Sequence, residues 1–199
     1  MRHSSHTRTN GRHSLTGWKS QACLSALATA LVLFAAPLSA NPVQPQAILV
    51  SQAKGRETGL PVPRFVSLRS REARMRVGPS TDYGTEWIYK VTGLPFEITA
   101  EYGNWRQVRD SDGISGWMHR ALLSSKRTAL IGPWIASPVA LRTEPASSAR
   151  ALAMLGARVR LGIRSCDGAW CNVEVTNHQV DGFIRQSALW GVYPTETIK

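Results

Sequence analysis

Residues 75–79 read Met-Arg-Val-Gly-Pro, and residues 141–145 read Leu-Arg-Thr-Glu-Pro, 66 positions further along the chain. Two more blocks repeat in the same order at offsets of 65 and 66: Gly-Asn-Trp at 103–105 with Gly-Ala-Trp at 168–170, and Gly-Trp-Met-His-Arg at 116–120 with Gly-Phe-Ile-Arg-Gln at 182–186. Three matching blocks at a nearly constant offset indicate two tandem repeats of one structural unit. Their bounds are predicted near 63–128 and 134–193.

Both repeats have the sequence pattern of short β-strands. Apolar and polar residues alternate in short runs, and a turn signal separates the runs every eight to twelve residues, which is typical of an all-β barrel or sandwich. The clearest run, Ala157 to Arg164, has apolar residues at one set of alternate positions and Arg or Gly at the other, as a half-buried strand requires. No stretch after residue 60 keeps a helical period for three turns. The predicted fold class is therefore all-β.

The first forty residues form a separate segment. They contain no acidic residue, four basic residues, an uncharged apolar run at 22–36, and then Pro37 and Ala40. This is the three-part pattern of a secretory signal peptide, and fifteen apolar residues fall short of the roughly 20 that a membrane span needs. We predict cleavage after Ala40 and a periplasmic or secreted protein; the alternative is an uncleaved N-terminal anchor. Residues 41–62, punctuated by Pro and Gly, are predicted to be a flexible linker.

The charge of the chain is its one extreme property. Its 24 Lys and Arg against 13 Asp and Glu give a net charge of +11, which is typical of proteins that bind nucleic acid, a membrane surface or an acidic polymer. Cleavage would leave 20 basic residues and a net charge of +7 on a chain outside the cytoplasm. We therefore expect no nucleic-acid partner and no stable membrane span after cleavage. The pattern predicts no particular oligomeric state.

The central hairpin of each repeat carries a paired feature. A turn centred between Gly168 and Ala169 places Cys166 directly opposite Cys171, at a cross-strand separation of about 4.5–5.5 Å that suits a disulfide. An even pair of cysteines in an exported chain is also expected to be oxidised. Strict alternation from Ile163 puts Cys166 on the polar face, so a bulge is needed to bring the two together. The equivalent pair in repeat one is Glu101 and Arg106, which are opposite charges across a hairpin.

These blocks resemble the bacterial SH3-like domain. In repeat one the resemblance rests on three blocks that cover nearly all of residues 66–124: Met75-Arg76-Val77-Gly78-Pro79-Ser80, Gly103-Asn104-Trp105, and Gly116-Trp117 with Leu122-Leu123. Repeat two looks like a diverged copy, because Glu144 replaces Gly78 and Phe183 replaces Trp117. The resemblance implies two small barrels of five to six strands, a cell-envelope location, and non-catalytic binding, often to peptidoglycan or to a protein.

Signals for catalysis are weak. The two cysteines after residue 40 are assigned to the disulfide, and no Gly-x-Ser-x-Gly element follows the signal segment. His119 and His178 are the two histidines after residue 40, and a lone His is more often packed or solvated than a base. We expect no catalytic site, no metal and no cofactor.

Repeat one carries a candidate ligand groove of aromatic and basic side chains. Aromatic surfaces flanked by polar loops suit extended peptides and the faces of sugars. The candidate residues are Tyr83, Trp87, Trp117, Arg74, Arg76 and Arg120. We expect Trp105 in the core, whereas Trp117 fits either the core or the groove. We interpret a stripe of Arg158, Arg160 and Arg164 as the solvated face of a strand.

Two functional hypotheses follow. The first is a non-catalytic cell-envelope module that binds peptidoglycan or another acidic envelope polymer, whose carboxylates match Arg and whose sugars match aromatic faces. The second is a periplasmic adaptor that binds a peptide segment of an envelope protein. An enzyme or a nucleic-acid binder is disfavoured by the missing residues and by export.

Overall fold

The computed structural model describes residues 53–199. The predicted signal peptide and residues 41–52 of the predicted linker lie outside this range. The remainder of that linker forms a small antiparallel hairpin of β1 (Ala53–Lys54) and β2 (Pro61–Val62). Within the described range, no helix has the length and apolar character needed to span a membrane.

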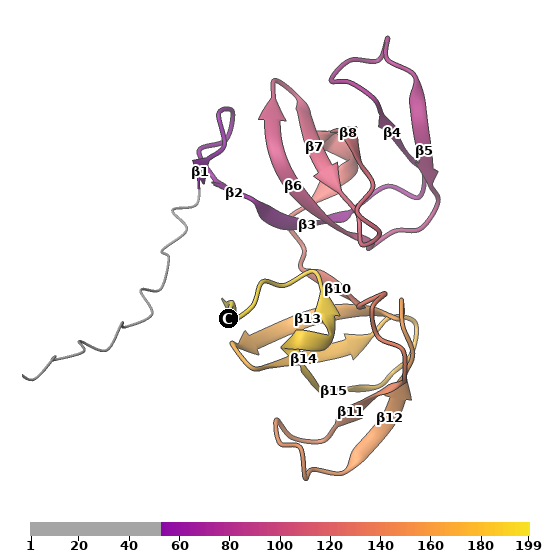
Figure 1. Cartoon of the computed structure of the whole chain (residues 1–199), viewed down its shortest axis with the longest axis vertical. Helices are drawn as coiled ribbons and strands as arrows, with labels where there is room; N and C mark the ends of the chain where they lie inside the picture. Colours follow the sequence, from indigo (N-terminus) through magenta and orange to yellow (C-terminus); the bar gives the residue numbers. More distant parts are fainter. Residues whose placement is uncertain (1–52) are drawn as a thin grey trace, which may run out of the picture. The chain divides into compact units, whose positions relative to one another are not determined.

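Barrel 1, residues 64–124, is a seven-stranded antiparallel sheet that curls around one core (Figure 1). The strands lie in the order β5-β4-β8-β7-β6-β3-β9, and the 3-10 turn η1 (Arg120–Leu122) precedes the last of them. Their bounds are β3 (Arg64–Leu68), β4 (Ala73–Arg76), β5 (Thr85–Tyr89), β6 (Pro95–Tyr102), β7 (Trp105–Arg109), β8 (Ser115–His119) and β9 (Leu123–Ser124). This order leaves β5 at one edge of the sheet.

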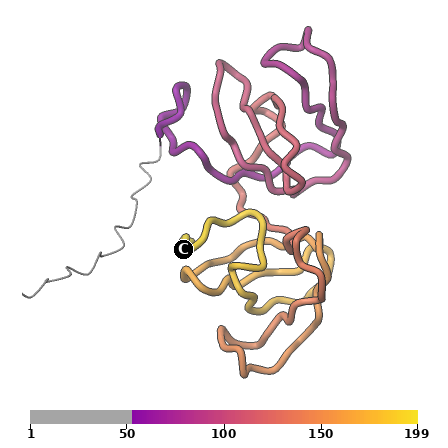
Figure 2. The backbone as a smooth tube through the Cα atoms, in the orientation of Figure 1, coloured from indigo at the N-terminus to yellow at the C-terminus, as the bar shows by residue number. Residues whose placement is uncertain are grey.

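Barrel 2, residues 128–198, repeats the same path. Its order is β12-β11-β15-β14-β13-β10-β16, and one further strand, β17, pairs with β13. The bounds are β10 (Thr128–Ile131), β11 (Val139–Arg142), β12 (Ala151–Leu155), β13 (Arg160–Asp167), β14 (Trp170–Val175), β15 (Asp181–Arg185), η2 (Gln186–Ala188), β16 (Leu189–Trp190) and β17 (Thr197–Ile198). Figure 2 shows the chain tracing the same course twice. The prediction of two tandem SH3-like barrels is confirmed.

Each barrel has its own hydrophobic core, built from alternate strand positions. Met75 and Phe96 are fully buried in barrel 1, and Leu141 and Leu161 are fully buried in barrel 2. Burying an apolar side chain of this size contributes about 1.5–3 kcal/mol. Each barrel is therefore stabilised by its own small core.

The central hairpin of barrel 2 confirms the predicted disulfide and supplies the missing bulge. Cys166 and Cys171 are direct cross-strand partners, bonded to each other, with their Cα atoms 4.1 Å apart. The register shifts between Ile163 and Ser165, so Arg164 is an extra residue and Cys166 turns to the buried side. Barrel 1 has the same irregularity between Ile98 and Ala100.

The start of β13 differs from the prediction. The alternating run was expected to be a strand from Ala157, but the strand begins at Arg160. Arg158 has a φ of 67°, in the left-handed region that turns use, and its guanidinium makes two hydrogen bonds with Asp112 of barrel 1, at 2.8 and 2.6 Å. The alternation of apolar and polar residues continues through this turn. Alternation alone therefore does not show where the turn ends and the strand begins.

Several contacts join the two barrels. The Phe65 ring of barrel 1 packs edge-on against Trp190, with ring centroids 5.2 Å apart, and meets the Tyr193 ring at a tilt, with centroids 4.7 Å apart. The Tyr193 hydroxyl donates to Glu97 Oε1 over 3.0 Å. These contacts fix the residues that line the junction described below.

Candidate ligand-binding site

The β4–β5 hairpin of barrel 1 builds the candidate site. Within its loop, the Val77 N–H donates to the Gly84 carbonyl over 3.2 Å, and Arg76 Nη1 donates to the Tyr83 carbonyl over 2.5 Å. A Cβ atom on Gly78 would lie 2.6 Å from carbons of the Tyr83 ring. Glycine at position 78 therefore lets the Tyr83 ring lie directly on the loop backbone.

Two aromatic side chains of this hairpin face solvent. Tyr83 and Trp87 each keep 48% of their surface exposed. Exposed aromatic surface near polar loop groups is a common feature of binding surfaces. The question is whether the hairpin needs these rings in order to fold.

Barrel 2 contains the same hairpin without these two aromatic rings, so the hairpin folds without them. Arg142 Nη1 donates to the Ala149 carbonyl over 2.6 Å, as Arg76 does to Tyr83, and the register shift recurs at the equivalent place, between Leu141 and Arg142. The equivalents of Tyr83 and Trp87 are Ala149 and Ala153. The arginine thus belongs to the hairpin fold, whereas the two aromatic rings are additions of barrel 1.

The six candidate groove residues do not lie on one surface. Trp117 is half-buried on the outer face of β8, directly opposite Arg76, and Arg74 is exposed one alternation further along β4. Trp87 instead pairs with Met75, whose side chain is in the core, so Trp87 lies on the other face of the hairpin.

Arg120 is separate from the rest of the candidate residues. It begins η1, three residues beyond Trp117, and lines a different pocket together with Arg64 and His119. Arg76 thus contacts the Tyr83 backbone and lies opposite Trp117, whereas Arg120 lies elsewhere.

Trp105 does not belong to the core, contrary to the expectation. It is half-buried on the outer face of β7 and meets the His119 ring edge-on at 5.6 Å. Its equivalent, Trp170, is buried beneath the guanidinium of Arg185, which lies 4.3 Å from the ring centroid. Large residues occur on both faces of this curled sheet. Sequence alternation shows that two residues lie on opposite faces but does not show which face is the core, so it did not distinguish an inward from an outward Trp105.

Two of the three arginines of the stripe, Arg158 and Arg164, form ion pairs within the protein. Arg158 pairs with Asp112, and its hydrogen bond lowers the pKa of that carboxyl group. Arg164 pairs with Glu174 and Asp181, at 3.5 and 3.1 Å. Arg158 and Arg164 therefore offer little unpaired charge to a ligand, whereas the Arg160 guanidinium bonds only to the neutral Thr92 carbonyl among the described residues.

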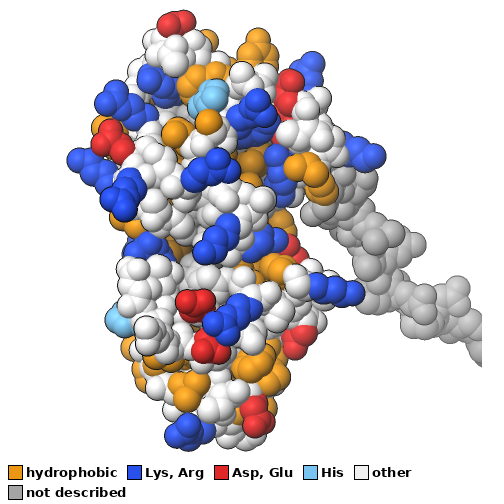
Figure 3. Space-filling model, turned by 180° about the vertical axis from the view of Figure 1, so that it is seen from behind, with side chains coloured by type: hydrophobic (Ala, Val, Ile, Leu, Met, Phe, Trp, Pro, Cys, Tyr) orange, Lys and Arg blue, Asp and Glu red, His pale blue; other side chains and the backbone are white. Residues whose placement is uncertain are grey.

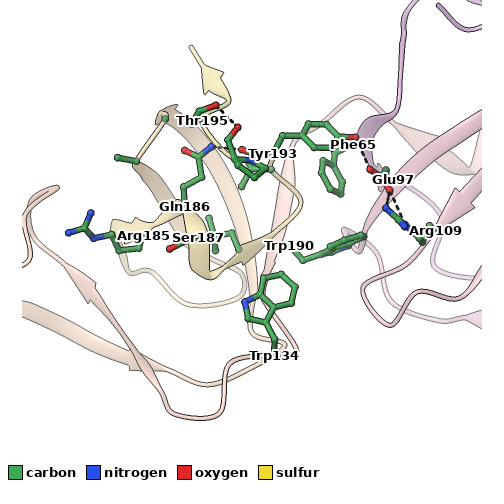
Figure 4. A pocket seen from close by; sticks show the side chains of 15 residues that line it. Phe65, Glu97, Arg109, Trp134, Arg185, Gln186, Ser187, Trp190, Tyr193 and Thr195 are labelled. Atoms are coloured by element: carbon green, nitrogen blue, oxygen red, sulfur yellow. Dashed lines mark hydrogen bonds and ion pairs between the residues drawn. The ribbon is translucent and has the colours of Figure 1, made fainter. Parts of the chain in front are cut away.

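A pocket of about 630 Å³ at the junction of the barrels was missed by sequence reasoning (Figure 4). Trp134 and Trp190 form part of its wall, and Trp134 is 54% exposed. Most of its polar groups are already paired: Arg109 and Tyr193 both bond to the Glu97 carboxylate. The wall of the pocket is mainly apolar. It is formed by residues of both barrels that lie far apart in the sequence, such as Phe65 and Trp190.

A protein-family model agrees with the two-barrel architecture. A family model described as a bacterial SH3 domain matches residues 69–125 and 136–191. Together these regions cover more than half of the chain, and the protein belongs to the bacterial SH3 domain family. Domains of this family are binding modules, typically non-catalytic, extracellular or secreted, and commonly bind cell walls.

Similar solved structures include an NlpC/P60 family protein from Bacillus cereus, at 13% identity and a TM-score of 0.28, covering 63% of this chain and 55% of that one. NlpC2 from Trichomonas vaginalis has 13% identity and a TM-score of 0.29, covering 64% of this chain and 48% of that one. This chain thus spans about half the length of each. No curated protein matches the chain.

Proposed function

We propose that this protein is a non-catalytic module of the cell envelope that binds peptidoglycan through the β4–β5 hairpin of barrel 1. The observation that carries the proposal is the internal comparison: two congruent hairpins, of which one bears exposed Tyr83 and Trp87 and the other bears alanines. Exposed rings that folding does not require are best explained by contact with a ligand.

The chemistry of the hairpin fits this polymer. Sugar rings present apolar faces that stack on aromatic side chains, and the stem peptides carry carboxylates. Arg74 lies exposed on β4, 3.8 Å from Glu72, so its charge is only partly compensated. Export through the predicted signal peptide, cleaved after Ala40, would place the module in the periplasm or outside the cell, in contact with this polymer.

The second candidate is an adaptor that binds a peptide segment of an envelope protein. It is favoured by the position of β5 at the edge of its sheet, where Trp87 and Ile88 are exposed. An edge strand can pair with an extended peptide. A peptide ligand would bind with little dependence on salt, unlike an acidic polymer.

Co-sedimentation with purified peptidoglycan at low and high salt tests the proposal. We expect binding that weakens as salt screens the charges, and a loss of about tenfold or more in the Tyr83→Ala/Trp87→Ala variant, since burying one such ring is worth about 1.5 kcal/mol or more. The matched control is Tyr102→Ala, which removes a ring that is 60% exposed on another hairpin. Absence of binding at both salt concentrations would exclude the polymer.

A further inference from the structure

A second pocket at the junction, of about 590 Å³, has a strongly basic wall. It is lined by loops and strands of both barrels, and its lining contains no Asp or Glu. The five basic residues are Arg69, Arg71, Lys90, Lys126 and Arg160. Figure 3 shows Lys and Arg side chains gathered over barrel 1 and around the junction on the face it draws.

The charges of this basic pocket are uncompensated within residues 53–199. The ion pairs found there use other arginines, among them Arg64, Arg109 and Arg158. Of the five basic side chains in the pocket, Arg160 makes a hydrogen bond, from Nη1 to the neutral Thr92 carbonyl over 2.7 Å. Five positive charges with no carboxylate among them repel one another, so an anion in the pocket would lower the energy of the folded protein.

One residue that lines the basic pocket, Thr128, has a buried hydroxyl with an unused hydrogen bond. Thr128 and Gly162 are direct cross-strand partners, so they share one face of the sheet. Thr128 is only 7% exposed, and its hydroxyl has no hydrogen-bond partner among the described residues. A buried hydroxyl left unpaired costs about 1–3 kcal/mol, and a rotation of the Thr128 side chain toward a bound acceptor would remove that cost.

Gly162, the cross-strand partner of Thr128, leaves open space on this face of the sheet. A Cβ atom at Gly162 would meet only the Glu174 carbonyl oxygen, 4.0 Å away. The backbone of Gly162 does not require glycine by a positive φ. The missing side chain therefore serves to leave room in the pocket.

We propose that the basic pocket binds a phosphate group. A phosphate carries up to two negative charges and several acceptor oxygens in a compact volume, whereas a single carboxylate would balance only one of five charges. Arg side chains bind phosphate oxygens in pairs, and Lys acts as a point charge. Since both barrels contribute cations, the bound group also holds them together. This site is separate from the β4–β5 hairpin and goes beyond peptidoglycan binding.

Calorimetry with inorganic pyrophosphate at low ionic strength tests the site in the full chain. We expect binding by the wild type and at least tenfold weaker binding by Lys90→Gln/Lys126→Gln. Lys54→Gln/Arg150→Gln removes two exposed charges elsewhere and is expected to bind as the wild type does. No binding by the wild type, or equal losses in both double variants, would overturn the proposal.

Two uncharged variants separate a built site from general attraction. Gly162→Val adds an isopropyl group to the lining of the pocket without changing its charge and should weaken binding at least tenfold, while Thr128→Val should weaken binding several-fold and leave stability unchanged or raised. Unchanged pyrophosphate binding in Gly162→Val would contradict the assignment even where the charge variants lose affinity. Circular dichroism confirms that each variant is folded.

The source of the phosphate is distinguished with lipid vesicles. Binding to phosphatidylglycerol vesicles that pyrophosphate displaces would identify a lipid headgroup, whereas pyrophosphate binding without vesicle binding would identify a soluble ligand. The Tyr83→Ala/Trp87→Ala variant should bind pyrophosphate normally, so failure of the hairpin proposal and failure of this one are separately visible.

Discussion

Glu101 provides a quantitative test of how barrel 1 is held together. Its side chain is fully buried and accepts hydrogen bonds from the Glu57 and Thr58 N–H groups, each at 3.0 Å, and from Thr58 Oγ1 at 2.7 Å. Arg64 Nη2 lies 2.6 Å from Oε1, and Arg106 Nε lies 3.4 Å from it. This carboxylate thus joins the β1–β2 hairpin to the barrel.

The pKa of Glu101 gives the magnitude. Burial alone would raise this pKa, but the hydrogen bonds from Thr58, Arg64 and the Glu57 backbone outweigh burial and lower it from 4.5 to about 2. At about 1.4 kcal/mol per pKa unit, the ionised carboxylate contributes roughly 3 kcal/mol to stability. Because the folded pKa is the lower one, this stability is complete above pH 4.5 and is lost as the pH falls toward 2; roughly 2 kcal/mol is gone at pH 3.

The assay compares wild type and Glu101→Gln by urea denaturation at pH 7 and pH 3. Gln keeps the shape of Glu but cannot ionise, so we expect the wild type to lose about 2 kcal/mol of its advantage over the variant at pH 3. Other carboxylates titrate equally in both proteins and cancel in the difference. An advantage of the same size at both pH values would refute the role of the ionised carboxylate.

Three further perturbations test the fold and the junction. Cys166→Ala/Cys171→Ala should lower the free energy of unfolding by about 2 kcal/mol, and thiol titration of the native wild type should detect no thiol from this pair; two reactive thiols would contradict the bond. Tyr193→Phe should cost about 1 kcal/mol in thermal denaturation, since it removes the hydroxyl that donates to Glu97, and an unchanged stability would show that this bond contributes nothing. Arg142→Ala should lower stability as Arg76→Ala does while leaving peptidoglycan binding intact; a loss of binding there would mean that barrel 2 also contacts the polymer.

The fold was largely predictable because its signals are local. Repeat spacing aligned the two barrels, and turn position alone set the pairing of Cys166 with Cys171 and of Glu101 with Arg106, both of which the structure contains. Where a bulge inserts a residue, sequence alternation did not predict which face a side chain occupies, since a shift of one position moves the side chain to the other face.

The candidate site was only partly predictable for the same reason. The register shift in the β4–β5 hairpin, between Met75 and Arg76, places Trp87 on the face opposite Arg76, which sequence spacing does not show. Contact between the barrels depends on residues distant in the chain, such as Phe65 and Trp190, and no local pattern encodes it. The equivalence of Tyr83 with Ala149 was visible in the alignment of the repeats, and that signal could have found the aromatic addition.

We propose that barrel 1 binds peptidoglycan through the exposed rings of its β4–β5 hairpin. The most direct measurement is the affinity of wild type, Tyr83→Ala/Trp87→Ala and Tyr102→Ala for purified peptidoglycan at low salt. We predict wild-type affinity for Tyr102→Ala and a loss of about tenfold or more for the double variant. Equal affinity of all three proteins, with each shown to be folded, would contradict it.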